Sequence, residues 1–303
     1  MRLLTRSDFD GLACGALLKA LGIIDSWKFV HPKDMQDGLV EVTENDILAN
    51  VPYAPGCKLW FDHHVSENER LGDDLKYEGR ATSADSAARV IYDYYDGAKK
   101  LPHFKEMVEA VDKVDAAKLT VDEIQNPKGW VLLGYLMDPR TGLGRFREFR
   151  ISNYQLMEIL IDACRTMNID EILDMPDVKE RVKMYFEQDK LFREMVKKHT
   201  RVVKNLIITD LRGVQPIYTG NRFLIYSLYP GQNISMWVVD GRVNNIAIAV
   251  GHSVLNRTSK TDVGVLLYEY GGGGHHQVGT CQVSVTNADA VIGVLTKAIT
   301  NDG

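Results

Sequence analysis

The chain has 303 residues, of which 45% are hydrophobic and 25% are charged, a composition typical of a globular protein with one large domain or two ordinary ones. The net charge of −5 argues against a protein that coats nucleic acid through a uniformly basic surface, although a local basic groove is compatible with it. The four cysteines form no C-x-x-C pair, no apolar run approaches membrane-spanning length, and acidic residues follow the N-terminus too early for a signal peptide. We therefore expect a cytoplasmic protein with reduced thiols and no membrane partner.

The first half of the chain alternates short apolar runs with helical patterns. Strands are expected at the start of "RLLTRSDFDG" and in "DSWKFVHP", "DILANVP" and "CKLWFD", and helices at about residues 11–21 and within residues 83–97. Ser83 is the expected N-cap of the second helix, and Gly97 is its expected stop. This alternation predicts a parallel α/β sheet, whose functional sites lie beyond the carboxyl ends of its strands.

The second half begins with a charged amphipathic helix and then becomes rich in β-structure. Residues 176–199 contain no glycine and predict one long helix. The following runs "RVVKNLIITDL", "RFLIYSLYP", "ISMWVVDG" and "NNIAIAVG" are typical of strands separated by turns. We therefore place a domain boundary near residue 190, which gives an N-terminal domain of residues 1–190 and a smaller α/β domain of residues 191–303.

Two clusters of polar residues follow predicted strands of the first domain. Asp8 and Asp10 follow the first strand, and Gly11 permits a tight turn into a helix, so both carboxylates could act only as helix caps. Asp62, His63 and His64 follow the "CKLWF" run, and carboxylate with imidazole suits Mn²⁺, Zn²⁺ or Fe²⁺ better than Ca²⁺. Because parallel strands end at one edge of their sheet, the clusters can converge, and convergence favours metal binding over capping.

A third cluster lies near the C-terminus, where Gly271–Gly274 precede His275 and His276. A glycine run can bring bare backbone N–H groups against an anion, although a flexible turn gives the same string. Phosphate-type donors lie upstream, namely Ser253, Asn256, Arg257 and Lys260. The cluster indicates a phosphate-binding loop.

The motifs "SDFDG", "DHH" and "GGGGHH" occur here in an order and spacing that resemble the DHH phosphoesterase superfamily. "TRSDFDGL", "WFDHH" and "GGGGHHQVGTCQV" are most similar to its exopolyphosphatase-related branch, and the resemblance spans nearly the whole chain. It implies an N-terminal catalytic DHH domain, a linker helix and a C-terminal DHH-associated domain that binds substrate. Members hydrolyse phosphoester or phosphoanhydride bonds with a divalent metal, usually Mn²⁺.

The resemblance also implies roles for individual residues. His64 would face the substrate phosphate, and Asp62 would orient it. Asp115 would be the last metal ligand, with Asp112 and Asp138 as alternatives. The implied metal ligands are Asp8, Asp10, Asn50, His63 and Asp115. The implied substrate-binding residues are Ser253, Asn256, Arg257, Gly272, Gly273, Gly274, His275 and His276.

Two positions depart from the family pattern. Leu4 stands where the family has a metal-binding histidine, and Asn50 stands where it has a bridging aspartate, with Asp46 as a less well placed substitute. If this alignment holds, the Leu4 and Asn50 side chains face the site. A neutral amide is a poorer bridging ligand than a carboxylate, because it carries no charge to hold two cations together. We therefore expect one metal ion, or a second one recruited only with substrate phosphate.

The expected function is that of a metal-dependent phosphohydrolase, either exopolyphosphatase-like or nucleotide phosphodiesterase-like. The cofactor would be Mn²⁺, Mg²⁺ or another divalent metal, as one or two ions. The expected partners are a phosphorylated small molecule, polyphosphate or a short single-stranded nucleic acid, and a homodimer is left open. The alternative is a non-hydrolytic phosphate- or nucleotide-binding protein with a degenerate metal site, since fold alone does not separate the two.

Overall fold

The computed structural model describes residues 1–64, 75–241 and 244–303. The chain forms two compact units. Unit 1 comprises Met1–Lys118 and Pro127–Tyr185, and unit 2 comprises Leu119–Asn126 and Phe186–Gly303. The segment 119–126 thus belongs to unit 2, although it interrupts unit 1 in the sequence. The domain boundary near residue 190 stays a prediction.

Unit 1 contains a five-stranded sheet in which every pairing is parallel, in the order β2-β1-β3-β4-β5. Its strands are β1 (Arg2–Thr5), β2 (Ser26–Phe29), β3 (Asp46–Ala49), β4 (Leu59–Asp62) and β5 (Gly79–Ala81). The predicted parallel α/β fold of this half is confirmed. The carboxyl ends of all five strands lie at one edge, so residues just beyond Thr5, Ala49 and Phe61 share that edge.

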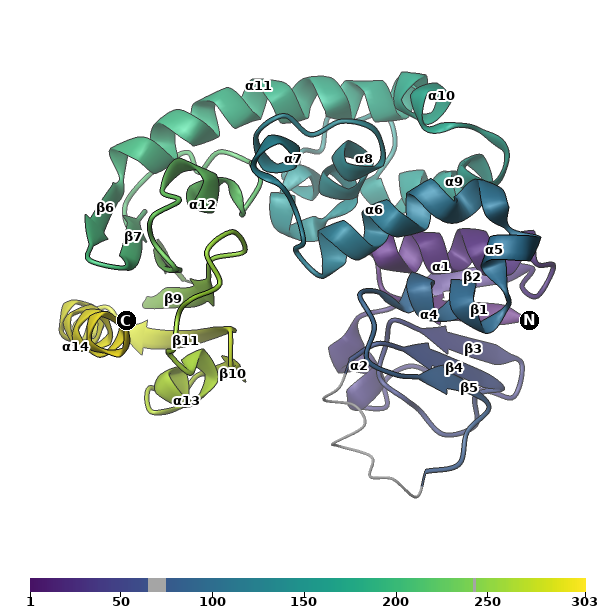
Figure 1. The fold of residues 1–303 in the computed structure, drawn as a ribbon, viewed down its shortest axis with the longest axis horizontal. Coiled ribbons are helices and arrows are strands. Elements are labelled where there is room, and N and C mark those ends of the chain that lie inside the picture. Colours follow the sequence, from purple (N-terminus) through teal and green to yellow (C-terminus); the bar gives the residue numbers. More distant parts are fainter. Residues whose placement is uncertain (65–74, 242–243) are drawn as a thin grey trace. The chain divides into compact units, whose positions relative to one another are not determined.

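Helices surround this sheet, and Figure 1 shows α1 and α4 along one of its faces. The helices of unit 1 are α1 (Phe9–Ala20), α2 (Pro32–Gln36), α4 (Ala87–Tyr94), α5 (Gly97–Lys100), α6 (Lys105–Asp115), α8 (Gly129–Met137), α9 (Asn153–Thr166) and α10 (Ile169–Asp174). Short 3₁₀ turns occupy η1 (Pro102–Phe104), η2 (Pro139–Thr141) and η3 (Leu143–Arg145). Helix α11 (Pro176–Lys198) begins in unit 1 and ends in unit 2. An apolar cluster that includes Leu4, Met35 and Trp60 joins the sheet to α2.

The helix predicted within residues 83–97 is shorter than expected, and its N-cap was assigned to the wrong serine. Ser86 caps α4, because its side-chain oxygen accepts a hydrogen bond from the Arg89 N–H at 3.0 Å. The helix ends at Tyr94, and Gly97 opens the separate helix α5 instead of stopping α4. Both serines satisfy the local rule for a cap, and tertiary contacts select the later one.

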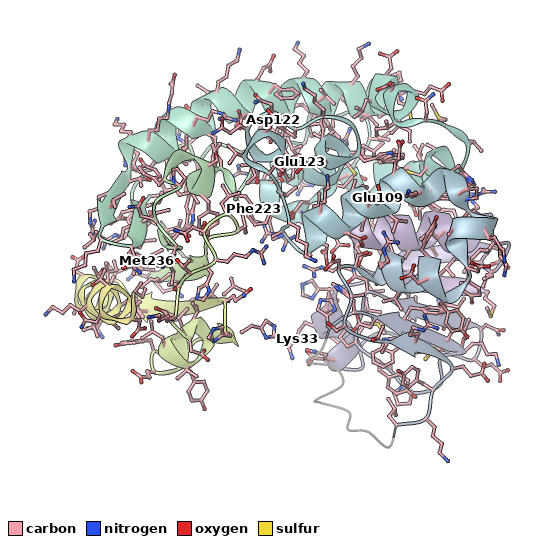
Figure 2. The ribbon with its side chains drawn as sticks, in the orientation of Figure 1. Lys33, Glu109, Asp122, Glu123, Phe223 and Met236 are labelled. Carbon is pink, nitrogen blue, oxygen red and sulfur yellow. The ribbon has the colours of Figure 1, made fainter. Side chains whose placement is uncertain are left out.

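Unit 2 contains a mixed six-stranded sheet in the order β10-β11-β9-β8-β7-β6, in which only β7 and β8 pair in parallel among the described strands. Its strands are β6 (Thr200–Val203), β7 (Leu206–Asp210), β8 (Ile234–Asp240), β9 (Asn245–His252), β10 (Gly273–His275) and β11 (Val278–Ser284). Its helices are α7 (Val121–Gln125), α12 (Leu224–Leu228), α13 (Val263–Tyr268) and α14 (Ala288–Asp302). Helices α13 and α14 pack on the sheet over an apolar core that contains Met236 (Figure 2).

The run "RFLIYSLYP" forms helix α12 where a strand was expected. A short apolar run is compatible with either a buried helix or a buried strand, so the period alone cannot decide. The helical form lets the Tyr226 hydroxyl reach Ser235 Oγ at 2.9 Å and the Gly251 carbonyl oxygen at 3.1 Å. Within the described part of the chain, no helix combines the length and the apolar character needed to cross a membrane.

Candidate metal centre

Asp8 lies in the turn between β1 and α1 and caps the helix. Its Oδ1 accepts hydrogen bonds from Gly11 N at 2.9 Å and from Asn50 Nδ2 at 3.0 Å. Its Oδ2 lies 3.0 Å from the Nε of Arg6. A Cβ at Gly11 would lie 1.9 Å from the Arg6 carbonyl oxygen, so only glycine permits this turn. Burial raises the pKa of Asp8, and the charge of Arg6 opposes that shift.

Asp10 lies in the first turn of α1 and binds the N-terminus of α4. Its Oδ2 accepts a hydrogen bond from Ala87 N at 2.9 Å, and its Oδ1 accepts one from Ala88 N at 2.7 Å. Burial raises the pKa of Asp10 well above its usual range, and the charges of Asp115 and Asp8 act in the same direction. Because these carboxylates repel one another, a bound cation would stabilise their charged forms.

His63 follows β4, and one of its ring nitrogens lies near the carboxylates of Asp10 and Asp115. Its Nδ1 lies 3.3 Å from the carbonyl oxygen of Ala84, which can only accept, and a ring that donates this bond from Nδ1 can offer Nε2 to a metal. Nε2 is buried, and among the described residues it has no hydrogen-bond partner. It lies 3.3 Å from Asp115 Oδ2 and 3.8 Å from Asp10 Oδ2.

Asp10, His63 and Asp115 therefore form a candidate ligand set for one metal ion. One ligand atom from each residue lies within 4.8 Å of the other two. A buried imidazole nitrogen between two carboxylates suits a divalent transition metal, and other protein groups fix the orientation of His63 and of Asp10. The residues present fit a single divalent cation at this position.

Asp62 and His64 lie beside this set. His64 Nδ1 is 2.8 Å from Asp62 Oδ1. Burial opposes protonation of His64, but the hydrogen bond and charge of Asp62, together with the charge of Asp115, outweigh it and raise its pKa. Asp62, His63 and His64 also form a candidate ligand group, which shares His63 with the first.

Asn50 has a left-handed backbone conformation, with φ at 56°, and its amide nitrogen donates to Asp8. Leu4 differs from the expectation, because its side chain is fully buried in the apolar cluster with Met35 and Trp60 and does not face the site. Successive side chains of a strand point to opposite faces of the sheet, and Leu4 lies on the face that packs against Met35 of α2.

The alternative aspartates are bound by other groups of the chain, and neither candidate ligand group includes them. Asp112 accepts hydrogen bonds from Ser86 Oγ at 2.7 Å and from Arg89 Nε at 2.9 Å. Asp138 accepts one from Arg140 Nε at 2.8 Å. Asp46 binds Arg2 Nε at 2.6 Å and is the first residue of β3, at the opposite edge of the sheet. Of these candidates, only Asp115 lies in the ligand set with His63.

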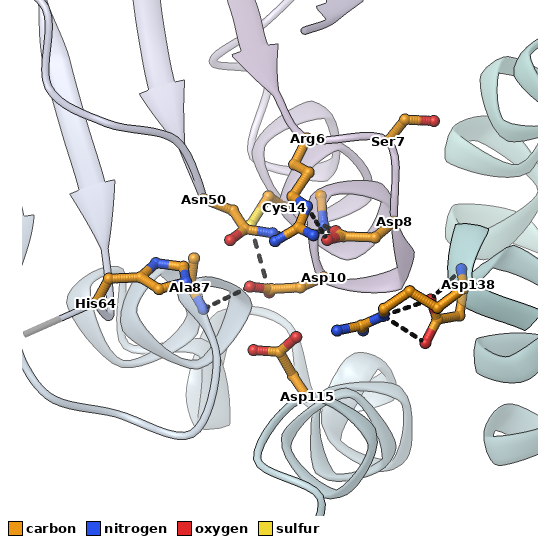
Figure 3. Close-up of polar contacts among 12 residues, drawn as sticks. Arg6, Ser7, Asp8, Asp10, Cys14, Asn50, His64, Ala87, Asp115 and Asp138 are labelled. Carbon is orange, nitrogen blue, oxygen red and sulfur yellow. Dashed lines mark hydrogen bonds and ion pairs between the residues drawn. The ribbon is translucent and has the colours of Figure 1, made fainter. Parts of the chain in front are cut away.

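Two arginines beside the carboxylates were missed in the sequence. Figure 3 shows Arg6 beside Asn50 and Asp8, with Asp115 facing Asp10. Arg6 is two residues from Asp8 in "TRSDFDG", so its position could have been noticed. Arg140 lies on η2, and the charges of Asp138, Asp8 and Asp115 help to raise its pKa against the effect of burial. No local signal connects Arg140 to residues so far away in the sequence.

The predicted substrate-binding residues lie together in unit 2. Gly273–His275 form β10, and a Cβ at Gly272 or at Gly274 would lie 2.2 Å from a carbonyl oxygen of the pairing region, so these glycines permit close strand packing. His276 Nδ1 lies 3.1 Å from Asp262 Oδ2.

The upstream members of the set form a turn beside this hairpin. Ser253 Oγ accepts hydrogen bonds from Leu255 N at 3.2 Å and Asn256 N at 3.0 Å. Asn256 Oδ1 accepts one from Thr258 Oγ1 at 2.8 Å, and Arg257 Nε donates to the Val254 carbonyl oxygen at 3.2 Å. The backbone bond from Val263 N to the His276 carbonyl oxygen, at 2.9 Å, joins the two segments.

No protein-family model and no curated protein matches the chain. Solved structures do match it. The pGpG-specific phosphodiesterase PggH of Vibrio cholerae is 48% identical over 100% of this chain and 99% of that one, with a TM-score of 0.90. An exopolyphosphatase-related protein of Bacteroides fragilis is 13% identical over 99% and 92% of the two chains, with a TM-score of 0.54.

RecJ of Thermus thermophilus, in complex with Mn²⁺, is 11% identical over 99% of this chain and 52% of that chain, with a TM-score of 0.52. RecJ and the Bacteroides protein share the fold alone at these identities. The site and the full-length similarity to PggH define a metal-dependent phosphohydrolase. The chain belongs to the DHH phosphoesterase superfamily, as the resemblance predicted.

Proposed function

We propose that the chain is a phosphodiesterase that hydrolyses pGpG, a linear dinucleotide with a 5′-phosphate, or a closely related short oligonucleotide. The observation that carries this proposal is the Asp10–His63–Asp115 ligand set within a chain 48% identical to a pGpG-specific phosphodiesterase over its whole length. Hydrolysis would add one water across the internal phosphodiester and release two molecules of GMP. The metal we propose is Mn²⁺, since carboxylate with imidazole suits it.

A divalent cation, when bound, supplies Lewis-acid stabilisation of the phosphodiester and makes water nucleophilic at neutral pH. Asp10 is held by two backbone N–H groups at the start of α4, so its carboxylate keeps one orientation. The Ala84 carbonyl oxygen holds the His63 ring with Nε2 toward the carboxylates. Little rearrangement of these two ligands is then needed on metal binding.

His64 is the group we propose for contact with the reacting phosphate. Asp62 raises its pKa and fixes Nδ1, so that a protonated ring would direct Nε2–H away from Asp62. A positive imidazolium stabilises negative charge that develops on phosphate oxygens during hydrolysis. Asp62 would act through His64 as a positioning residue.

The test is a Mn²⁺-supplemented hydrolysis panel with the full chain. The panel contains pGpG, pApA, longer RNA, cyclic di-GMP, polyphosphate and 3′-phosphoadenosine 5′-phosphate. We expect the highest kcat/KM for pGpG, with GMP as the product, and loss of that activity in His63→Ala. Faster release of phosphate from polyphosphate, with no cleavage of pGpG, would replace this proposal with an exopolyphosphatase.

A further inference from the structure

The Asp8 carboxylate is bound on both of its oxygens, as that of Asp10 is, but the partners of Asp8 include a positive guanidinium, whereas those of Asp10 are backbone N–H groups. Oδ1 accepts from Gly11 N at 2.9 Å and from Asn50 Nδ2 at 3.0 Å, while Oδ2 lies 3.0 Å from Arg6 Nε. Neither ligand group found among the described residues includes Asp8. A cation placed beside Asp8 would meet the positive guanidinium of Arg6 and the amide hydrogens of Asn50.

The other residues implied for a second metal ion do not fit one either. Leu4 is fully buried in the apolar cluster with Met35 and Trp60. Asn50 turns a donor toward Asp8, and its amide carries no charge to hold two cations together. The two candidate ligand groups share His63, and in one of them Asp62 and His64 are already hydrogen-bonded to each other. The part of the chain that the structure describes therefore supports one metal ion.

We propose that this protein works with a single divalent cation and that the Arg6 guanidinium takes the place of the second. Arginine is permanently charged, and its planar fork matches the geometry of a phosphate group. The side chain of Arg6 is 36% exposed, so substrate can reach it, while its bond to Asp8 fixes its Nε. A substrate phosphate would then lie between the metal at Asp10–His63–Asp115 and the guanidinium beside Asp8.

The metal count follows from the chain's own residues, whereas the contact of Arg6 with pGpG rests on the proposed function. The first experiment therefore uses no substrate. The full chain is equilibrated with Mn²⁺, the bound metal is measured by elemental analysis, and an electron paramagnetic resonance spectrum is recorded. We expect one Mn²⁺ per chain and the spectrum of an isolated ion. Two ions per chain with an exchange-coupled spectrum would overturn the proposal.

A double variant tests whether Arg6 and Asn50 exclude the second ion. Arg6→Ala with Asn50→Asp removes the cation and supplies a bridging carboxylate, so we expect two Mn²⁺ per chain and an exchange-coupled spectrum. The matched control is Arg150→Ala, because Arg150 pairs with Asp177 outside the metal centre and should leave the count at one. A folded double variant that still binds one ion would overturn the exclusion by Arg6. If the double variant does not fold, the count on the parent chain still decides the proposal.

The role of Arg6 toward phosphate is tested with pGpG. Arg6→Ala should lower kcat/KM by about 10²-fold, the usual effect of removing a charge-stabilising donor. Arg6→Lys should recover part of that loss, and free guanidinium ion should partly rescue Arg6→Ala, which a structural role would not produce. A loss below about threefold, or no rescue, would overturn the assigned role. Failure of the parent to cleave pGpG would instead refute the proposed function and leave the metal count standing.

Discussion

Asp46 and Asp10 are buried aspartates near opposite ends of the strands of the same parallel sheet, and their surroundings differ. Asp46 lies at the amino end of its strand, and Asp10 lies just beyond the carboxyl ends, in the first turn of α1. Asp46 opens β3 and pairs in register with Arg2 of β1. Burial acts to raise the pKa of Asp46, but hydrogen bonds from Arg2 and Thr43 outweigh it and lower the pKa. At the other edge, burial and two neighbouring carboxylates raise the pKa of Asp10.

The opposite pKa shifts distinguish a carboxylate that stabilises the fold, Asp46, from a candidate metal ligand, Asp10. Asp46 is satisfied by groups of the chain itself, since Thr43 N and Arg2 Nε bind it at 2.7 Å and 2.6 Å. Asp10 is held by backbone N–H groups but faces Asp115 and Asp8, so a bound cation would further stabilise its negative charge. Strongly raised pKa values of clustered carboxylates are typical of functional sites.

The largest expected effect is that of His63→Ala. Loss of this ligand should weaken Mn²⁺ binding and lower kcat/KM for pGpG by about 10²-fold or more, since even partners of a ligand cost 10–100-fold. Titration calorimetry and steady-state kinetics measure the two quantities. His103→Ala, at an exposed position of η1, is the control. If His63→Ala bound Mn²⁺ with the affinity of the parent, His63 would not be a metal ligand.

Leu4 lies on the same strand as Arg2, and a substitution there tests whether this strand contributes to the candidate metal centre. Leu4→His would place an imidazole in the apolar cluster, so the free energy of unfolding should fall by about 3 kcal/mol. The number of bound Mn²⁺ ions should not change. Urea unfolding and elemental analysis check both expectations, with Leu39→His as the control because Leu39 is 73% exposed. A stable Leu4→His variant with an added metal ion would return Leu4 to the site.

Asp46→Asn tests whether the Asp46 carboxylate stabilises the fold. It should lower the free energy of unfolding at pH 7 by about 1.5–3 kcal/mol, the usual contribution of hydrogen bonds to a charged group. Because the folded pKa of Asp46 is lowered, its contribution is fully present above the unfolded pKa of about 3.9 and is lost as pH falls through the folded pKa. Urea unfolding of parent and variant at decreasing pH should therefore show a shrinking difference. A constant difference would mean that the Asp46 charge is not involved.

Asp115→Asn should have the opposite effect in the absence of metal. Removing a charge that faces Asp10 and Asp8 relieves repulsion, so in chelator the variant should be more stable by about 0.5 kcal/mol. With Mn²⁺ at 100 times its Kd, the parent should gain about 2.7 kcal/mol and the variant less. Thermal unfolding with and without Mn²⁺ measures this reversal. A variant less stable than the parent in chelator would place Asp115 with Asp46 among the structural carboxylates.

The last prediction concerns unit 2, where the family resemblance implies that Arg257 binds substrate phosphate. Arg257→Ala should raise KM for pGpG by about tenfold, a loss of about 1.4 kcal/mol in binding, with kcat little changed. Arg201→Ala, an exposed arginine of β6, is the control. A fall in kcat at constant KM would mean that Arg257 acts in the transition state.

The parallel sheet and the convergence of its two polar clusters could be predicted because each depends on local signals. "SDFDG" carries its own glycine turn, and "WFDHH" marks the end of a buried strand. The partners of these clusters could not be predicted from local rules. One example is the N-cap of α4, which is Ser86 and not Ser83. The segment around this cap makes long-range contacts, because the Ala84 carbonyl oxygen contacts His63 and Ala87 N donates to Asp10.

Leu4 shows a different kind of failure. The family spacing placed it at the site, whereas in the folded chain it lies in the apolar cluster with Met35 and Trp60. The strand expected at α12 was wrong because "RFLIYSLYP" has no hydrophobic period that distinguishes a helix from a strand. Arg140 was missed because its relation to Asp8 and Asp115 exists only in the folded chain.

The segment 119–126 has a consequence for how this protein can be divided. Helix α7 lies within it and is fastened to later parts of unit 2, because Arg193 Nη2 donates to the Gln125 carbonyl oxygen at 2.8 Å and Asn221 Nδ2 to that of Ile124 at 3.3 Å. Cutting the chain once near residue 186 would leave these donors without their acceptors in the C-terminal fragment. The two units therefore cannot be exchanged between relatives as simple cassettes, and a chimaera must carry residues 119–126 from the same parent as its C-terminal part.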